Sequence, residues 1–398
     1  MSVNSSYERF FDVPIGPQHP ALKEPLFLKL VVEGEHVIAA DVDVSYTHRG
    51  VERALQERNY IQNIYLVERI CGICNVAHTL CYCQNVEGLY EVEVPSRALY
   101  IRVLVEELAR IHSHLLWLGV AAHEIGFDTL FMYVWRDREA VMDLIEEITG
   151  NRVTSAINTI GGVRRDIKTE TSDRCLKIMD YIEERTKYYK KVCETDPTIA
   201  ARCAGVGILK PDDAVRLCAV GPTLRASNVK YDVRADDPYA AHDEVPFNVI
   251  VYDTNDTLGR ILVRIDEIFE SINMVRYCIK HMPSGPVRVR LRLNPPAGEH
   301  VSRVEAPRGE LIHYVRSNGS EKPERYKVRT PTFENLPALC EMLTSRGDYV
   351  VNIADVPVVF ASIDPCLSCT SRVAVLDREK ETVWIGRLEE LKRLRRRC

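Results

Sequence analysis

The chain has 398 residues, of which 46% are hydrophobic and 27% charged, and its net charge is −5. This composition is typical of a soluble globular protein and excludes a disordered or fibrous one, and the negative balance argues against a nucleic-acid partner. No apolar run approaches the roughly 20 residues that a membrane-spanning helix needs. The one basic cluster, Leu391 to Cys398, is expected to be a solvated tail or to contact an anionic surface.

The cysteines indicate the redox compartment. There are thirteen, an odd number, scattered along the chain. The first residues, MSVNSSYERF, lack the charged start and apolar core of a secretory signal. We therefore expect a reducing compartment, with thiols free or bound to metal rather than paired in disulfides.

The predicted elements begin with a β-hairpin, because LFLKLVVEGEHVIAADVDV alternates polar and apolar residues around Gly34. Residues 96–126, 137–150 and 172–193 then show helical spacing of apolar residues, with Gly119 and Gly126 as late breaks in the first of these helices. Past about Met282, GPVRVRLRLNPPAG and GELIHYVRSNG alternate as strands do. NLPALCEMLTS predicts a helix and PVVFASI a buried strand.

Together these patterns predict an α+β fold, a central bundle of long helices with antiparallel sheet contributed by the N-terminal and C-terminal regions. No internal repeat or clear linker interrupts the chain. We expect one domain over residues 1–372, with strands to about residue 60, helices over 61–285, and strands over 286–372. Residues 373–398 follow as a tail.

Two cysteine pairs carry the chemistry. ERICGICNVAH contains Cys71 and Cys74, and DPCLSCTSR contains Cys366 and Cys369 at the same spacing. Two such pairs facing each other can hold one or two soft metal ions. A closed zinc site and an iron-sulfur cluster are both open on spacing alone. The pairs are about 290 residues apart, whereas zinc ribbons close short loops, which weakens the zinc interpretation.

RICGIC with DPCLSC closely resembles the paired motifs of nickel-iron hydrogenase large subunits. The segments GPQHPALKEP, THRGVE, RIHSHLLWLG, GNRV, IGGVRRDI and EAPRGE resemble the membrane-associated, energy-converting branch of that family, which is related to the 49-kilodalton-type subunit of respiratory complex I. The resemblance runs from about Pro14 to Arg372, nearly the whole chain, and implies that family's fold.

The resemblance, and nothing in the spacing, implies the metals. It implies nickel held by all four thiolates, with Cys71 and Cys366 terminal and with Cys74 and Cys369 bridging to an iron that carries carbonyl and cyanide ligands. The activity implied is heterolytic cleavage of H2 and its reverse, with H2 and protons as substrates, and Cys366 is expected to take part in catalysis.

Three further residues have roles in that picture. Arg308, in EAPRGE, matches the family arginine over the metal pair, and its guanidinium can donate to a cyanide. Glu24, in HPALKEP, matches the carboxylate that passes protons between the terminal thiolate and solvent. His78 follows Cys74 by four residues, so on a helix its ring can reach back to the bridging sulfur.

Other histidines and cysteines give less specific predictions. His19 and His48 are open between scaffold hydrogen bonding and proton traffic. His112 and His114 are two apart on a helix and should point in different directions, which disfavours joint metal ligation. Cys81 and Cys83 are expected to be buried thiols.

The sequence departs from the wider family at Arg372, where many large subunits carry a histidine that helps hold magnesium and precedes a cleaved tail. The presence of magnesium is therefore left open, although Glu52, in HRGVE, matches one of the residues that usually hold it. Residues 373–398 are either a maturation peptide or a retained basic element.

The resemblance also implies partners. The chain has no ferredoxin-like cysteine run, so electrons would leave through a small iron-sulfur subunit, with ferredoxin as the redox partner. Membrane subunits would couple the reaction to ion movement while this chain stays peripheral on the cytoplasmic face. The alternatives are a quinone-reducing complex I subunit, whose relatives lack the four cysteines, and a zinc-stabilised scaffold, which would need neither Arg308 nor Glu24.

Overall fold

The N-terminal region forms a three-stranded antiparallel sheet. The computed structural model describes residues 9–20, 22, 24–292 and 294–370, and the backbone of 375–377 and 382–384. The strands, in the spatial order β1-β2-β3, are β1 (Phe11–Ile15), β2 (Phe27–Glu33) and β3 (His36–Asp43). The predicted hairpin is confirmed, with Gly34 at positive φ in its turn. Leu28, Leu30 and Val32 alternate inward along β2 and are buried.

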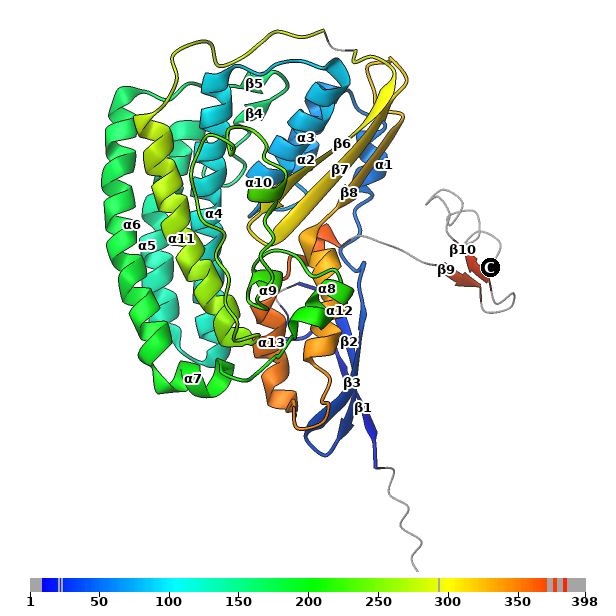
Figure 1. The fold of residues 1–398 in the computed structure, drawn as a ribbon. Helices are drawn as coiled ribbons and strands as arrows, with labels where there is room; N and C mark the ends of the chain where they lie inside the picture. Colours follow the sequence, from blue (N-terminus) through cyan, green and yellow to red (C-terminus); the bar gives the residue numbers. More distant parts are fainter. Residues whose placement is uncertain are drawn as a thin grey trace, which may run out of the picture.

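Four long helices stand side by side as a bundle (Figure 1). They are α4 (Ser96–Ile125), α5 (Asp128–Thr149), α6 (Thr169–Thr195) and α11 (Thr257–Lys280). Gly126 ends α4 in the left-handed conformation, as predicted. The break predicted at Gly119 is wrong, because α4 continues through it. A Cβ on Gly119 would lie 2.4 Å from Cδ1 of Trp135, so this glycine gives α5 room to approach.

The C-terminal region forms a second antiparallel sheet, whose strand order is β6-β7-β8. Its strands are β6 (Gly298–Ala306), β7 (Gly309–Ser317) and β8 (Arg325–Arg329). The sheet packs on α3, and the helices on this side are α1 (Val51–Leu55), α2 (Tyr60–Glu68) and α3 (Asn75–Tyr90) (Figure 1). Leu80, Val304, Leu311 and Val315 belong to the shared core. The α+β fold with sheet from both ends is confirmed, and the two ends form separate sheets.

The strand predicted in GPVRVRLRLNPPAG is wrong for residues 285–292, which make only an isolated bridge between Arg288 and Gly162 in the described part of the chain. The N–H of Val289 and the carbonyl of Val287 bond to the short hairpin of β4 (Asn158–Thr159) and β5 (Gly162–Val163). Gly162 lies so close that a Cβ would be 2.2 Å from the Val287 oxygen. The alternating segment thus pairs with a two-residue strand and cannot extend.

The strand predicted at PVVFASI is also wrong, because the segment is the helix α13 (Val356–Ser362). Pro357 occupies its first turn, and Asn352 and Asp355 form a capping box on the preceding turn η1 (Ile353–Asp355). A short buried apolar run has the same pattern in a strand and in a helix. The proline and the capping box are helix-start signals, and they decide for the helix. The predicted helix at NLPALCEMLTS is confirmed within α12 (Pro331–Met342).

The N-terminal sheet and the segment around α12 meet in the lower part of Figure 1, where α12 packs on β3 and Val37 donates to the carbonyl of Val351. The remaining elements are α7 (Pro197–Cys203), α8 (Pro211–Arg216), α9 (Pro222–Arg225), α10 (Val233–Asp236), η2 (Leu367–Cys369), β9 (Val375–Asp377) and β10 (Thr382–Trp384). Most of the predicted tail, and Arg372, lie outside the described residues.

Candidate metal centre

The first cysteine pair lies in the loop between α2 and α3. Cys74 directly precedes the first residue of α3, and Cys71 lies one turn earlier. The backbone N–H groups of Ile73 and Cys74 both point at the Cys71 sulfur, each 3.4 Å away. Such converging N–H groups favour a thiolate at Cys71.

The second pair follows α13 and is held by α12. The Cys366 N–H donates to Thr332 Oγ1 at 3.1 Å, and Thr330 Oγ1 donates to the Cys369 carbonyl at 3.0 Å. Asp364, two residues before Cys366, adopts a positive φ of 53°, which turns the chain from α13 into the cysteine loop. Threonines from one helix start therefore fix both ends of this motif.

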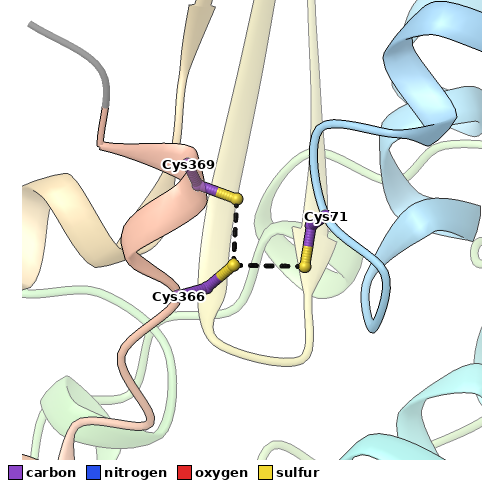
Figure 2. Close-up of side chains that lie close together, drawn as sticks. All are labelled: Cys71, Cys366 and Cys369. Atoms are coloured by element: carbon purple, nitrogen blue, oxygen red, sulfur yellow. Dashed lines mark hydrogen bonds between the residues drawn. The ribbon is translucent and has the colours of Figure 1, made fainter. Parts of the chain in front are cut away.

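The two motifs meet although their sequence positions are far apart (Figure 2). The Cys366 sulfur lies 3.2 Å from the sulfurs of Cys71 and Cys369. Cys74, Cys369 and the His78 ring form a second group with donor atoms within 4.8 Å of one another. Four thiols, three of them buried, thus converge as one soft donor set, which fits nickel, iron or zinc by its chemistry.

The thiols of the cluster differ in the direction in which their pKa is shifted. Hydrogen bonds from the thiols of Cys366, Cys369 and Cys74 hold the pKa of Cys71 well below its ordinary value. Donation to the sulfurs of Cys366 and Cys71 raises the pKa of Cys369 well above its ordinary value. One thiolate among three thiols is a metal-free arrangement, because a metal held by all four sulfurs displaces their protons.

Arg308 lies in the turn between β6 and β7 and is buried beside the cysteines. Its Nε donates to the Asp364 carbonyl at 2.7 Å, and its Nη2 to the Asp364 carboxylate at 2.8 Å. Burial opposes its charge, but Asp364 and the nearby Cys366 and Cys71 sulfurs raise the pKa of Arg308 overall. Gly221 packs against this turn, where a Cβ would be 2.4 Å from the Arg308 oxygen. The site thus keeps a fixed, buried cation.

Glu24 reaches the second motif from the N-terminal region. Its carboxylate accepts hydrogen bonds from the Leu367 N–H, from the Ser368 N–H at 3.3 Å and from Ser368 Oγ at 2.8 Å. With Cys71, Cys366 and Arg308 it lines a cavity of about 200 Å³. The predicted acid, cation and two terminal thiols therefore face one chamber.

His78 contacts a different sulfur from the one expected. Its Nε2 lies 3.9 Å from the Cys369 sulfur, in the second motif, whereas sequence reasoning directed it back to Cys74. The reason is that α3 starts at Asn75, so a side chain on its first turn projects across the gap between the motifs. Burial lowers the pKa of His78 to about 4.

Arg49 is a site residue that sequence reasoning did not single out, although it lies in the quoted block THRGVE. Its guanidinium donates to the carbonyls of Arg69 at 2.9 Å, Ile70 at 2.8 Å and Ser368 at 3.0 Å. Ile70 and Ser368 directly precede Cys71 and Cys369. The arginine therefore joins the two cysteine loops, and its sequence signal is only its membership of that block.

The remaining predictions lie away from the sulfurs. His112 contacts the Ile73 carbonyl and His114 contacts Glu267, so their predicted divergence is confirmed. Cys81 and Cys83 are buried thiols as predicted, and burial raises the pKa of Cys81 to about 12.

The magnesium anchor and two histidines have other surroundings. Glu52 pairs with the ammonium of Lys327 and accepts from the Val328 N–H at 3.1 Å, so a cation already faces its carboxylate. His48 is exposed, and His19 lines an apolar cavity of about 280 Å³ that shares Phe360 with the chamber of Glu24. Their roles stay predictions.

Two known families match this chain. The family described as "Respiratory-chain NADH dehydrogenase, 49 Kd subunit" matches residues 124–293 and 289–372, and the family "Nickel-dependent hydrogenase" matches residues 49–197. The carbon monoxide-induced hydrogenase of Rhodospirillum rubrum is 39% identical over 91% of this chain and 99% of its own length. The chain belongs to the family of hydrogenase and complex I large subunits.

Other members of this hydrogenase and complex I family share comparable identity. The membrane-bound hydrogenase subunit alpha of Pyrococcus furiosus is 40% identical over 94% of this chain and 91% of its own length. An NADH-quinone oxidoreductase subunit of Rhizobium etli is 36% identical over 89% of this chain and 93% of its own length. These relatives are hydrogenases and quinone oxidoreductases alike.

A solved structure confirms the fold of this family. A chain of the membrane-bound sulfane sulfur reductase, described as an archaeal respiratory membrane complex, is 30% identical with a TM-score of 0.86 and covers 94% of this chain and 100% of its own length. Among the described residues, no helix has the length and apolar character needed to cross a bilayer.

Proposed function

We propose that this chain is the catalytic large subunit of an energy-converting nickel-iron hydrogenase that cleaves and forms H2. The observation that carries the proposal is the convergence of four thiols, two of which, Cys71 and Cys366, line one chamber together with a buried arginine and a carboxylate. A zinc-stabilised scaffold would need the thiols but gains nothing from Arg308 and Glu24 at the same cavity. The hydrogenase relatives support the same choice.

Cys71, Cys74, Cys366 and Cys369 would hold nickel, and Cys74 and Cys369 would also hold an iron with carbonyl and cyanide ligands. When bound, this pair of metals supplies the heterolytic splitting of H2. The four thiols lose their protons on loading, which leaves a strongly anionic donor set in a buried site. Arg308 is the buried charge that offsets it.

Arg308 orients a donor group toward the chamber. Asp364 accepts hydrogen bonds from its Nε and Nη2, which hold the guanidinium plane in one orientation. The remaining nitrogen, Nη1, lies 3.5 Å from Ser113 Oγ. A fixed planar donor of this kind can hydrogen-bond a small anionic ligand such as cyanide and exclude water from its place.

Glu24 holds and moves the proton. Its Oε1 and Oε2 are oriented by the N–H groups and hydroxyl of the second motif, and the same carboxylate opens on the chamber of Cys366. A carboxylate fixed next to the terminal thiol and partly open to solvent can take a proton from one and release it to the other.

The proposal includes partners. Electrons would pass to a small iron-sulfur subunit and then to ferredoxin, and membrane subunits would use the released energy to move ions. Two relatives are subunits of membrane-bound complexes by their names, which supports peripheral attachment to a membrane complex; the cytoplasmic face is part of the proposal. The second candidate is a quinone oxidoreductase subunit, which the relative in Rhizobium etli favours.

Metal analysis with infrared spectroscopy tests these candidates in the purified native complex. Stoichiometric nickel, with iron in excess of nickel because the iron-sulfur subunit adds its own, and carbonyl and cyanide bands are expected. Stoichiometric zinc without those bands would refute the hydrogenase, and quinone reduction by a complex that contains neither nickel nor iron at these cysteines would establish the second candidate. Cys81→Ser is the matched control, because this thiol is buried outside the cluster.

A further inference from the structure

A row of polar side chains, buried except for the partly buried His300, leads from the cysteine cluster along the interface between α3 and the second sheet. It starts at the Cys369 sulfur, passes between α3 and the strands β7, β8 and β6, and ends at a hollow beside α3 that His300 lines. Its members, in order from the sulfur, are His78, His313, Tyr326, Asn85 and His300.

The inner members are joined by short contacts. His78 Nδ1 lies 3.2 Å from His313 Nε2, and His313 Nδ1 lies 2.7 Å from the Tyr326 hydroxyl. His313 occupies an inward position of β7 between Leu311 and Val315, where strand alternation calls for an apolar residue. A buried imidazole at such a position requires a partner on both ring nitrogens, and His78 and Tyr326 supply them.

The outer members of the row are Asn85 and His300. The Asn85 Oδ1 lies 3.0 Å from His300 Nδ1, which leaves the Asn85 amide nitrogen to face the other way. This buried nitrogen has no partner of ordinary geometry among the described residues. Burial raises the pKa of Tyr326 well above its ordinary value. Asn85 lowers this pKa, which is the effect of a group that donates to the phenol oxygen. The Tyr326 hydroxyl can donate its proton to His313 Nδ1, 2.7 Å away.

The direction of the row follows from counting protons. Burial lowers the pKa of His313 well below its ordinary value, so its ring is neutral and has one N–H. If Tyr326 donates to Nδ1, the proton of His313 must be on Nε2, and it points at His78 Nδ1. His78 then carries its own proton on Nε2, which faces the Cys369 sulfur.

We propose that His313 and Tyr326 are positioning residues that fix His78 as a hydrogen-bond donor to the Cys369 sulfur. A donor at this sulfur withdraws electron density from a bound metal and so tunes its electronic properties. The proposal rests on the proposed function only in that Cys369 is taken as a metal-bound thiolate. It assigns a role to two residues of β7 and β8 that lie outside both cysteine motifs.

The test uses the full chain, prepared without metal and loaded with Co²⁺ alone. A hydrogen bond lowers the energy of sulfur electrons, so its loss moves the thiolate-to-cobalt absorption to lower energy. His78→Phe is expected to give the largest such shift, and His313→Phe and Tyr326→Phe smaller shifts in the same direction. His313→Gln can accept from Tyr326 and donate to His78, so it should return the band toward the wild-type position.

Tyr252→Phe is the matched control, because it removes a partly buried hydroxyl that donates to Asp266 away from the cysteines. If Tyr326→Phe leaves the band at the wild-type position while His78→Phe shifts it, or if His313→Gln shifts it as far as His313→Phe does, the proposal is overturned. Tyr326→Phe removes one oxygen only, so it provides a result even if His313→Phe does not fold. Because the cobalt band needs only thiolates, native zinc instead of nickel and iron would refute the proposed function and leave this test intact.

Discussion

Arg49 donates a hydrogen bond to the carbonyl of Ser368 from the same nitrogen that binds the carbonyl of Ile70. Each of these carbonyls precedes a cysteine of a different motif. The arginine therefore sets the distance between the two halves of the cluster while it is itself exposed to solvent.

Arg49→Gln is predicted to loosen the two loops. It removes three hydrogen bonds from a charged donor, and we expect a loss of about 1–3 kcal/mol in unfolding free energy and a several-fold lower nickel content. Thermal unfolding and metal analysis measure both. Arg53→Gln is the control, because Arg53 has only an exposed ion pair with Glu57, and it should change stability by less than about 0.5 kcal/mol. Equal metal content in Arg49→Gln and wild type would contradict the prediction.

Cys366→Ser is predicted to abolish H2-dependent dye reduction and to lower nickel occupancy. The Cys366 sulfur lies 3.2 Å from a thiol of each motif, so its loss removes one of the four ligands and a close contact between the two pairs. Cys81→Ser should keep both properties, since its hydroxyl can still bond the Ser302 oxygen. Wild-type turnover in Cys366→Ser would remove this thiolate from the mechanism.

Glu24→Gln is predicted to slow turnover by roughly 10²–10⁴-fold with nickel and iron content unchanged. The amide oxygen can still accept from the Leu367 N–H, so the loop stays in place, but the amide cannot carry a proton. Hydrogen-deuterium exchange of H2 with solvent is the sensitive assay. A variant that keeps wild-type exchange would move the proton exit elsewhere.

Glu305 predicts a pH dependence of stability. Burial, with the neighbouring Asp232, raises its pKa to about 7 from 4.5, against the opposing effect of Arg225, Arg234 and Arg110. Between these values the folded chain binds a proton that the unfolded chain releases, so this group lowers stability as pH rises, by at most about 1.4 kcal/mol per pH unit.

Glu305→Gln removes that contribution. The difference in thermal midpoint, variant minus wild type, should therefore grow between about pH 4.5 and pH 7 and level off above that range. Comparing the two proteins at each pH cancels the opposite trend of the buried histidines, such as His114, whose pKa burial lowers to about 4. A constant difference across the range would show that Glu305 titrates at its ordinary pKa.

Sequence reasoning predicted the features that depend on local pattern. The hairpin at Gly34, the long helices and the end at Gly126 follow from periodicity and from conformations that glycine adopts freely. PVVFASI was misjudged because a short apolar run has no period of its own. Gly119 was misjudged because its reason, the ring of Trp135, lies on another helix.

The site divides in the same way. Equal spacing indicated the four cysteines, and matching blocks indicated Arg308 and Glu24. Arg49 acts through three backbone carbonyls, which have no sequence signature at all. His313 could have been suspected, because it interrupts an inward apolar row in GELIHYVRSNG, but its partner on α3 depends on how the sheet packs.

The closeness of Cys71 and Cys366, 295 residues apart in sequence, also constrains how the protein is made. During synthesis the first pair leaves the ribosome long before its partner exists, and it cannot enclose a metal by itself. Stable insertion of the metal requires that α13 and the loop after it have first packed against the N-terminal half. Metal loading would thus distinguish complete chains from incomplete ones, because a chain that is truncated or stalled before Cys369 lacks a complete metal site.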